Sequence, residues 1–184
     1  NIGRAIKRLL DNNIIIGEGW HKEAGTPHAE VHAIQQVKNK ALLKNSTIYV
    51  NLEPCNHFGK TSPCTDLIIQ SKIPRVVIGS KDQNPIVAGK GIKILQDAGC
   101  KVSTGILKKE SDFLNRRFFS FYNKKRPYII LKWAQTKDTF IAPINERNKK
   151  GEIFWISNSI SRQRVHQWRS EEVAILVGVQ TIIQ

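Results

Sequence analysis

A histidine, a carboxylate and two cysteines form the most chemically informative pattern in the sequence. His28 and Glu30 stand two residues apart in "PHAEVHA", and Cys55 and Cys64 follow further along the chain. Imidazole and thiolate groups are the usual protein ligands of zinc. One histidine and two cysteines leave the fourth tetrahedral position free for water, which is typical of a catalytic site. The pattern therefore predicts a zinc ion bound by His28, Cys55 and Cys64.

Glu30 is suited to move protons at such a site. Zinc lowers the pKa of a bound water, so that hydroxide forms near neutral pH. A carboxylate beside it can carry protons between the water, a ring nitrogen and leaving ammonia. His28-Ala29-Glu30, followed by Pro54-Cys55 and a second cysteine, matches the pattern of zinc nucleobase deaminases. Each of these residues alone is more often a surface or core residue, and only their combined order favours zinc.

Alternating strands and helices are expected to position these side chains. Strands are predicted at 12–20, 46–52, 75–80 and 100–106, and helices at 2–10, 29–43, 65–73, 91–99 and 108–122. This alternation is typical of an α/β layer with parallel strand pairing. His28 and Glu30 then lie at the start of a helix. Cys64 comes just before the next helix, for which Thr65 is the expected N-cap.

A second unit follows the basic linker "NKKRP" at 123–127. We expect strands at 128–134 and 174–179 and a helix at 162–172. The predicted domains are therefore 1–122 and 126–184, and the second has too few residues to close a core. The chain has no methionine and ends within an apolar pattern. We therefore expect it to be part of a longer protein.

The amino-acid composition indicates which classes of molecule the protein binds. The net charge of +14 implies an acidic partner, such as a phosphorylated metabolite, nucleic acid or a membrane surface. The basic residues are spread along the chain, which favours a mostly solvated surface with some phosphate binding. No apolar run is long enough to span a membrane and no signal-peptide pattern opens the chain, so we expect a soluble, cytoplasmic protein. Three cysteines do not suit a disulfide scaffold.

The spacing of the cysteines is unusual for a deaminase. Many deaminases have Cys-x-x-Cys, whereas eight residues, "NHFGKTSP", separate Cys55 from Cys64. This insertion carries His57, Lys60 and Thr61, polar groups suited to a phosphate or a polar base.

Five segments together resemble the RibD family, the bifunctional deaminase–reductases of riboflavin biosynthesis. They are "GEGWHKEAGTPHAE", "NLEPCNHFGKTSPC", "DQNPIVAGKGIKILQDAG", "RPYIILKWAQTKD" and "RSEEVAILVG". The resemblance implies a cytidine-deaminase-like α/β/α domain acting on 2,5-diamino-6-ribosylamino-4(3H)-pyrimidinone 5′-phosphate. It implies zinc at His28, Cys55 and Cys64, and Glu30 as the catalytic proton carrier. The implied substrate contacts are His21, His57, Lys60, Thr61 and Asn84.

For the second unit, the resemblance implies the first part of a dihydrofolate-reductase-like α/β domain. That domain would use NADPH to reduce the ribosyl side chain to ribityl, although no Gly-x-Gly-x-x-Gly fingerprint is present. The implied NADP contacts are Gln135, Trp155 and Thr181, and the implied substrate contacts are Lys132, Ile153 and Arg169. The implied partners are a small-molecule substrate and further copies of the chain, with no nucleic acid and no membrane.

One departure from the family concerns a strand. The family carries a "PNPxVG" strand and turn before "IIGEGWH", whereas here "KRLL" runs directly into "DNNIIIGEGW". We expect this central strand to lie outside the given residues rather than to be deleted. Two other functions stay open: a zinc deaminase of a tRNA base or another nucleotide, and a zinc-stabilised module without catalysis.

Overall fold

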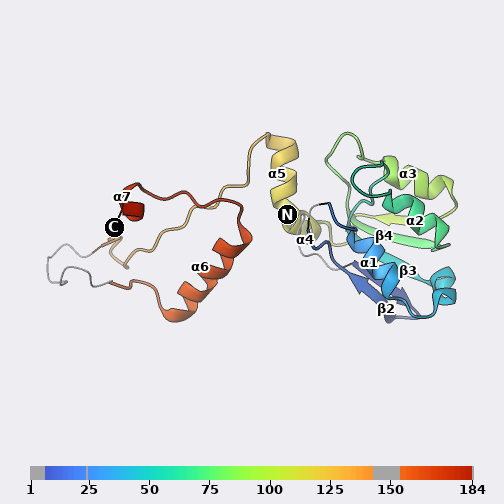
Figure 1. The fold of residues 1–184 in the computed structure, drawn as a ribbon, viewed down its shortest axis with the longest axis horizontal. Helices are drawn as coiled ribbons and strands as arrows, with labels where there is room; N and C mark the ends of the chain where they lie inside the picture. Colours follow the sequence, from blue (N-terminus) through green and yellow to red (C-terminus); the bar gives the residue numbers. More distant parts are fainter. Residues whose placement is uncertain (1–6, 24, 143–153, 184) are drawn as a thin grey trace. The chain divides into compact units, whose positions relative to one another are not determined.

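A computed structural model of the chain describes residues 7–23, 25–142 and 154–183 (Figure 1). The chain separates into two units, Asn1–Ile129 and Ile130–Gln184. Among the described residues, no helix is both long and apolar enough to cross a membrane.

The first unit is built on a five-stranded sheet with the order β2-β1-β3-β4-β5. The strands are β1 (Lys7–Asp11), β2 (Ile14–Gly19), β3 (Thr47–Leu52), β4 (Arg75–Ser80) and β5 (Lys101–Thr104). The β3–β4 and β4–β5 pairs are parallel, whereas β1 pairs with β2 and β3 in antiparallel fashion. The expectation of parallel pairing is therefore wrong for the two strand pairs that include β1. A tight hairpin turn explains the difference, because Asn12 and Asn13 both adopt the left-handed conformation that such a turn requires.

Strand β1 corrects two expectations. Residues 2–10 are predicted as a helix, but Lys7–Asp11 form a strand between β2 and β3, and residues 2–6 lie outside the described residues. Cross-strand pairing outweighs helical spacing here, since Leu9 is fully buried between its neighbours. Because the described residues already supply a strand at this central place, the sheet does not lack one.

Helices pack on both faces of the sheet. They are α1 (Ala29–Gln36), α2 (Cys64–Gln70), α3 (Lys90–Asp97) and α4 (Lys108–Leu114). Helix α5 (Arg116–Lys124) contacts α4, and a 3-10 helix, η1 (Lys40–Asn45), follows α1. Helix α1 is shorter than the predicted 29–43, and Asn39 caps η1 by accepting the Ala41 N–H. Helix α2 begins at Cys64 with Pro63 as its N-cap, so Thr65 lies inside the helix rather than capping it.

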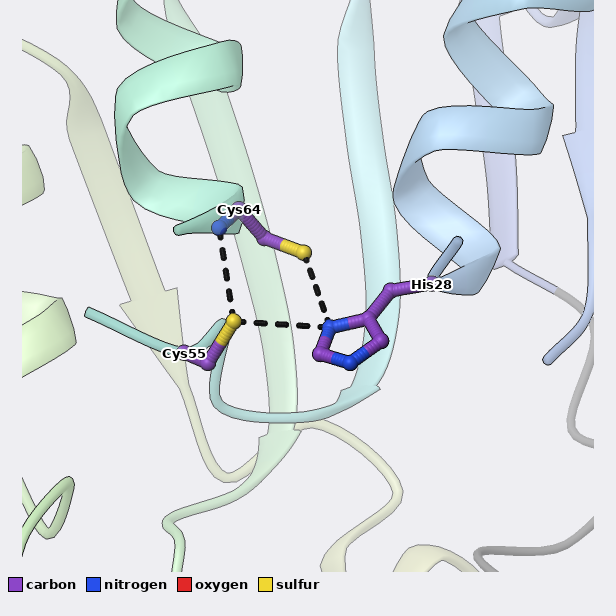
Figure 2. Close-up of side chains that lie close together, drawn as sticks. All are labelled: His28, Cys55 and Cys64. Carbon is purple, nitrogen blue, oxygen red and sulfur yellow. Dashed lines mark hydrogen bonds between the residues drawn. The ribbon is translucent and has the colours of Figure 1, made fainter. Parts of the chain in front are cut away.

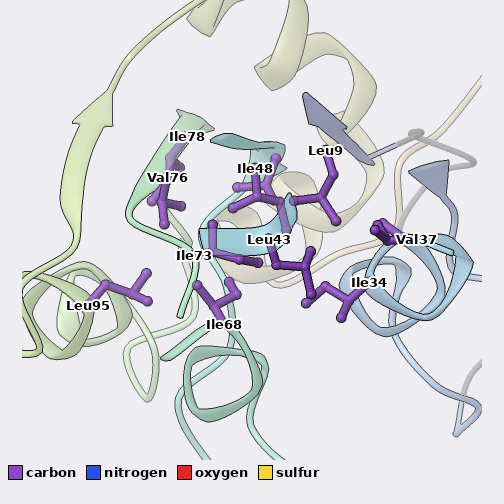
Figure 3. Packing of buried hydrophobic residues seen from close by; sticks show 12 residues of the cluster. Leu9, Ile34, Val37, Leu43, Ile48, Ile68, Ile73, Val76, Ile78 and Leu95 are labelled. Carbon is purple, nitrogen blue, oxygen red and sulfur yellow. The ribbon is translucent and has the colours of Figure 1, made fainter. Parts of the chain in front are cut away.

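The core lies between the sheet and helices α1, α2 and α3. Alternate residues of β3 and β4, such as Ile48 and Ile78, point into it, in line with the two-residue period of a strand. Figure 3 shows these side chains together with Ile34, Ile68 and Leu95 from the three helices. The opposite face of the sheet meets α4, where Asn51 of β3 donates a hydrogen bond to Asn115.

The second unit contains helices α6 (Ser159–Glu171) and α7 (Gln180–Ile183). The strands predicted at 128–134 and 174–179 are absent from the described residues. A strand needs a partner for its backbone groups, and none of the described residues supplies one. The described residues of this unit are all at least partly exposed, including Leu176 at 99%. No described residue of this unit belongs to the hydrophobic core.

Candidate active site

His28, Cys55 and Cys64 come together at one end of the sheet (Figure 2). His28 directly precedes α1, Cys55 lies in the loop after β3, and Cys64 is the first residue of α2. The His28 Nδ1 atom lies 3.3 Å from Cys64 Sγ and 3.4 Å from Cys55 Sγ. The backbone N–H of Cys64 donates to Cys55 Sγ at 3.4 Å. Three segments distant in sequence thus bring three soft ligand atoms within 4.8 Å of one another.

This cluster fits a zinc ion. Bonds of about 2.3 Å to sulfur and about 2.0 Å to nitrogen, at tetrahedral angles, would place nitrogen and sulfur about 3.5 Å apart. The two observed distances from nitrogen to sulfur, 3.3 and 3.4 Å, are close to this value. The chemistry of one imidazole and two thiols also matches zinc rather than magnesium or calcium, which take oxygen ligands.

The three residues of the cluster have pKa values that are shifted in different directions. Hydrogen bonds from Cys64 and, less strongly, from His28 lower the pKa of the Cys55 thiol from 9.0 to about 4. The same bond to Cys55, together with burial, raises the pKa of Cys64. The hydrogen bond to Cys55 also raises the pKa of His28. A metal ion that takes these three ligands must therefore displace the proton of Cys64 and compete with protonation of His28.

Glu30 lies in the first turn of α1 and is 2% exposed. Its Oε1 atom forms an ion pair with Lys7 Nζ at 2.5 Å. Its Oε2 atom is buried without a hydrogen-bond partner among the described residues. Burial raises the pKa of this carboxyl, but the charge and hydrogen bond of Lys7, a backbone hydrogen bond and the charge of His28 together lower it further, so the net pKa is lowered. Glu30 is therefore a buried carboxylate with one oxygen held and the other available.

Two glycines allow α1 to approach the sheet closely enough to place these groups. A Cβ atom on Gly17 would lie 2.3 Å from the carbonyl oxygen of Ala33. One on Gly19 would lie 2.5 Å from that of Ala29. Strand β2 and helix α1 therefore touch backbone to backbone, along the helix that carries Glu30 and begins after His28.

Two of the five residues expected to contact substrate are histidines: His21 lies beside the cluster, and His57 follows Cys55 by two residues. The His21 ring lies edge-on to the His28 ring, with centroids 5.1 Å apart. Burial is the main cause of the lowered pKa of His21, and the charge of His28 adds to it. The Nε2 atom of His21 and the Nδ1 atom of His57 are buried without partners among the described residues. Both rings thus offer polar atoms to a ligand.

The other three expected contacts lie in loops. Lys60 packs over Gly25, because a Cβ atom added to Gly25 would lie 3.0 Å from Lys60 Cδ. The loop between Cys55 and Cys64 therefore contacts the turn after His21. The carbonyl oxygen of Thr61 accepts the Gly59 N–H at 3.2 Å, which makes a local turn. The Asn84 side chain accepts the Ile86 N–H at 3.1 Å.

Three residues near the site were not predicted from the sequence. Lys7 was missed because its segment was expected to be helical. Glu53 and Asp82 are buried carboxylates at 3% and 8% exposure. Glu53 was recognisable in "NLEPC" as an acidic residue that directly follows an apolar strand.

Comparison with known proteins decides the family. A family model described as "Cytidine and deoxycytidylate deaminase zinc-binding region" matches residues 8–80, and "RibD C-terminal domain" matches residues 127–184. The diaminohydroxyphosphoribosylamino-pyrimidine deaminase of Buchnera aphidicola subsp. Schizaphis graminum is 51% identical over 111 residues, covering 60% of this chain and 74% of that protein. The chain belongs to the RibD family.

RibD proteins match nearly the whole chain. "Riboflavin biosynthesis protein RibD" of Aquifex aeolicus is 48% identical over 170 residues, covering 92% of this chain and 46% of the relative. The crystal structure of the Thermotoga maritima deaminase/reductase is 39% identical with a TM-score of 0.84, covering 97% of this chain and 50% of that chain. The "Acinetobacter baumannii RibD, form 2" structure has a TM-score of 0.82 at 36% identity, covering 97% and 48%. The chain thus spans about half the length of the RibD relatives it matches.

The residues predicted for the RibD reductase half lie in the second unit. Gln135 accepts a hydrogen bond from Trp133, and Trp155 lies under the Arg162 guanidinium at 4.3 Å from its ring centre. Thr181 lies in α7 and Arg169 in the last turn of α6. No hydrogen bond or ring contact among the described residues joins any two of Lys132, Gln135, Trp155, Arg169 and Thr181. Ile153 lies outside the described residues.

Proposed function

We propose that the first unit catalyses the hydrolytic deamination of 2,5-diamino-6-ribosylamino-4(3H)-pyrimidinone 5′-phosphate. The observation that carries this proposal is the His28–Cys55–Cys64 cluster with the buried Glu30 carboxylate two residues from His28. The 51% identical Buchnera relative named as a deaminase of this type supports the choice of substrate.

In this proposal His28, Cys55 and Cys64 hold the zinc ion. When bound, the ion supplies a Lewis acid that lowers the pKa of a water molecule. Glu30 would take a proton from the attacking water through its unpaired Oε2 atom, while Lys7 holds Oε1. Glu30 would give this proton to a ring nitrogen, then take the second proton of the same water, now the hydroxyl added to the ring carbon, and give it to the departing amine. Water and substrate are consumed, and ammonia and the corresponding pyrimidinedione are formed.

The remaining side chains bind the substrate. Lys60 carries a positive charge on the loop between the two cysteines and suits the 5′-phosphate. The unpartnered ring nitrogens of His21 and His57 suit polar atoms of the base and ribose. Thr61 and Asn84 complete the set of proposed contacts.

The test is ammonia release from this phosphorylated diaminopyrimidine by the purified, zinc-loaded protein. Glu30→Gln should lower kcat by about a thousandfold, because general acid–base catalysis contributes about 10²–10⁴-fold, while zinc content stays unchanged. A chelated sample should be inactive, and Glu110→Gln, which removes an exposed carboxylate on α4, should behave like wild type. Activity that survives Glu30→Gln would exclude the proton-carrying role. Deamination of RNA or of another nucleotide, without deamination of this pyrimidine, would contradict the proposed substrate.

For the second unit, the match to the RibD C-terminal domain supports a role in NADPH-dependent reduction of the ribosyl side chain. We propose that Gln135, Trp155 and Thr181 contact NADP and that Lys132, Ile153 and Arg169 contact the sugar. The experiment is NADPH oxidation with the deaminated product, using a protein of the full length of its RibD relatives. Substitution of Gln135 by Ala should raise KM for NADPH in that protein without changing ammonia release. An unchanged KM for NADPH would count against this assignment.

A further inference from the structure

Glu53 joins two loops of the candidate site. Its buried carboxylate accepts backbone N–H groups from Asp82 at 3.2 Å and Gly89 at 2.9 Å on Oε2. The Ile92 N–H donates to Oε1 at 3.1 Å. All three donors belong to the segment 82–92, which links β4 to the first turn of α3. Glu53 itself stands two residues before Cys55.

The segment held by Glu53 carries Asn84. Asp82 Oδ1 accepts the Asn84 N–H at 2.7 Å, and Asn84 Oδ1 accepts the Ile86 N–H at 3.1 Å. Gly89 adopts a positive φ of 82° that most other residues would resist. Side-chain oxygen atoms of Glu53, Asp82 and Asn84 therefore accept backbone N–H groups of this loop, which has no neighbouring strand among the described residues to accept them.

A close backbone contact fixes the far end of the same segment. A Cβ atom on Gly91 would lie 2.4 Å from the carbonyl oxygen of Pro54. At the near end, the Glu53 N–H donates to Ser80 O at 2.9 Å. The Asn84 loop is thus attached at both ends to the short stretch that leads into Cys55.

We infer that Glu53 is a positioning residue that holds the Asn84 loop against the zinc-ligand loop and so sets the affinity for the pyrimidine substrate. The inference rests on the proposed function, since it takes Asn84 as a substrate contact. A carboxylate has acceptor lone pairs for all three donors, whereas an amide presents one acceptor oxygen and an NH₂ group that opposes a donor. Glu53→Gln should therefore loosen the loop while Glu30 and the zinc ligands keep their places.

The experiment compares wild type, Glu53→Gln and the control Glu110→Gln, which removes a carboxylate from the first turn of α4 instead. Steady-state deamination gives KM and kcat, elemental analysis gives zinc content, and hydrogen exchange reports the amides of Asp82, Gly89 and Ile92. Glu53→Gln should raise KM about tenfold with kcat changed less than about threefold, because an unpaired buried donor costs the loop its fixed geometry. Zinc content should be unchanged, and the three amides should exchange at least about tenfold faster.

Unchanged KM or unchanged exchange at these amides would overturn the inference, as would a loss of zinc that accounts for the loss of activity. If Glu53→Gln does not fold, Glu53→Asp retains the charge but shortens the reach, and a smaller rise in KM with faster exchange is expected. An unchanged KM in that variant overturns the inference too. Failure of the proposed function is distinguishable, because wild type itself would then release no ammonia, whereas the exchange measurement needs no substrate.

Discussion

At the residue scale, the candidate site depends on charges that are paired inside the protein. Glu30 is buried and would be costly to ionise alone, but Lys7, at 13% exposure, lies beside it. Burial raises the pKa of the Glu30 carboxyl, whereas the Lys7 ammonium lowers it. Removing either partner therefore leaves an uncompensated buried charge.

Lys7→Met should lower the free energy of unfolding of the metal-free protein by about 3 kcal/mol at neutral pH. The folded pKa of Glu30 is lowered, so the stabilisation is present above the ordinary glutamate pKa of 4.5 and is lost as pH falls through the folded value. The difference between the two proteins should accordingly shrink in acid. Urea unfolding at several pH values measures it.

The double variant Lys7→Met/Glu30→Gln should recover much of the lost stability, since it removes both charges together. An equal loss for Lys7→Met at all pH values, or no recovery in the double variant, would show that the ion pair is not the cause.

Zinc binding should release protons. The raised pKa of Cys64 means that this thiol holds its proton near neutral pH in the metal-free protein, and the raised pKa of His28 makes its imidazole harder to deprotonate. Zinc takes the thiolate and the neutral imidazole, so uptake near neutral pH should release about one proton from Cys64, with a further contribution from His28 as pH is lowered, and zinc affinity should fall as pH falls. Calorimetric titration in buffers of different ionisation enthalpy counts them. Cys100→Ser, outside the cluster, should give the same count, whereas release of no protons would contradict the arrangement described for the cluster.

At the element scale, the position of α1 depends on small residues in β2. The backbone of Gly17 lies so close to that of Ala33 that no side chain fits between them. Helix α1 carries Glu30 and begins directly after His28. The contact between strand and helix therefore controls where two of the four key side chains lie.

Gly17→Ala should displace α1 and destabilise the first unit by about 2 kcal/mol, within the range of overpacked cores. Zinc affinity should fall as well, because His28 moves away from the two cysteines. Thermal unfolding with and without zinc, and a zinc titration, measure both effects. Gly178→Ala serves as control, since its added Cβ meets only Thr181 Oγ1 at 3.8 Å. Equal zinc affinity in Gly17→Ala and wild type would contradict this account of the contact.

At the scale of the whole molecule, the two units differ in how much they bury. The core residues all belong to the first unit, and the described residues of the second expose most of their large apolar side chains. Local stability follows burial and backbone pairing. The two units of the 184-residue chain should therefore differ in their resistance to unfolding and cleavage.

Limited proteolysis of this 184-residue chain should remove residues beyond about 130 first and leave the first unit intact. Mass spectrometry of the products locates the cuts. The zinc-loaded fragment should retain its metal, because all three ligands lie in the first unit. Protection of 128–134 or 174–179 would instead indicate that these segments do pair as strands.

The sequence by itself determined the chemistry of the candidate centre. Ligand types, their order and the long spacing between Cys55 and Cys64 predicted a zinc cluster, whose atoms the fold brings within 4.8 Å. The helices α1, α2 and α3 and the strands β3, β4 and β5 were also predicted, since the spacing of their apolar residues is a local signal.

Only the tertiary structure decided how the centre is supported. Lys7 was assigned to a helix, because helical spacing in "AIKRLL" is local whereas its pairing partners, β2 and β3, are not. For the same reason the Lys7–Glu30 ion pair and the three amides bound by Glu53 could not be predicted. Each joins residues more than 20 positions apart. The predicted strands beyond residue 127 failed because an apolar run becomes a strand only where a partner satisfies its backbone.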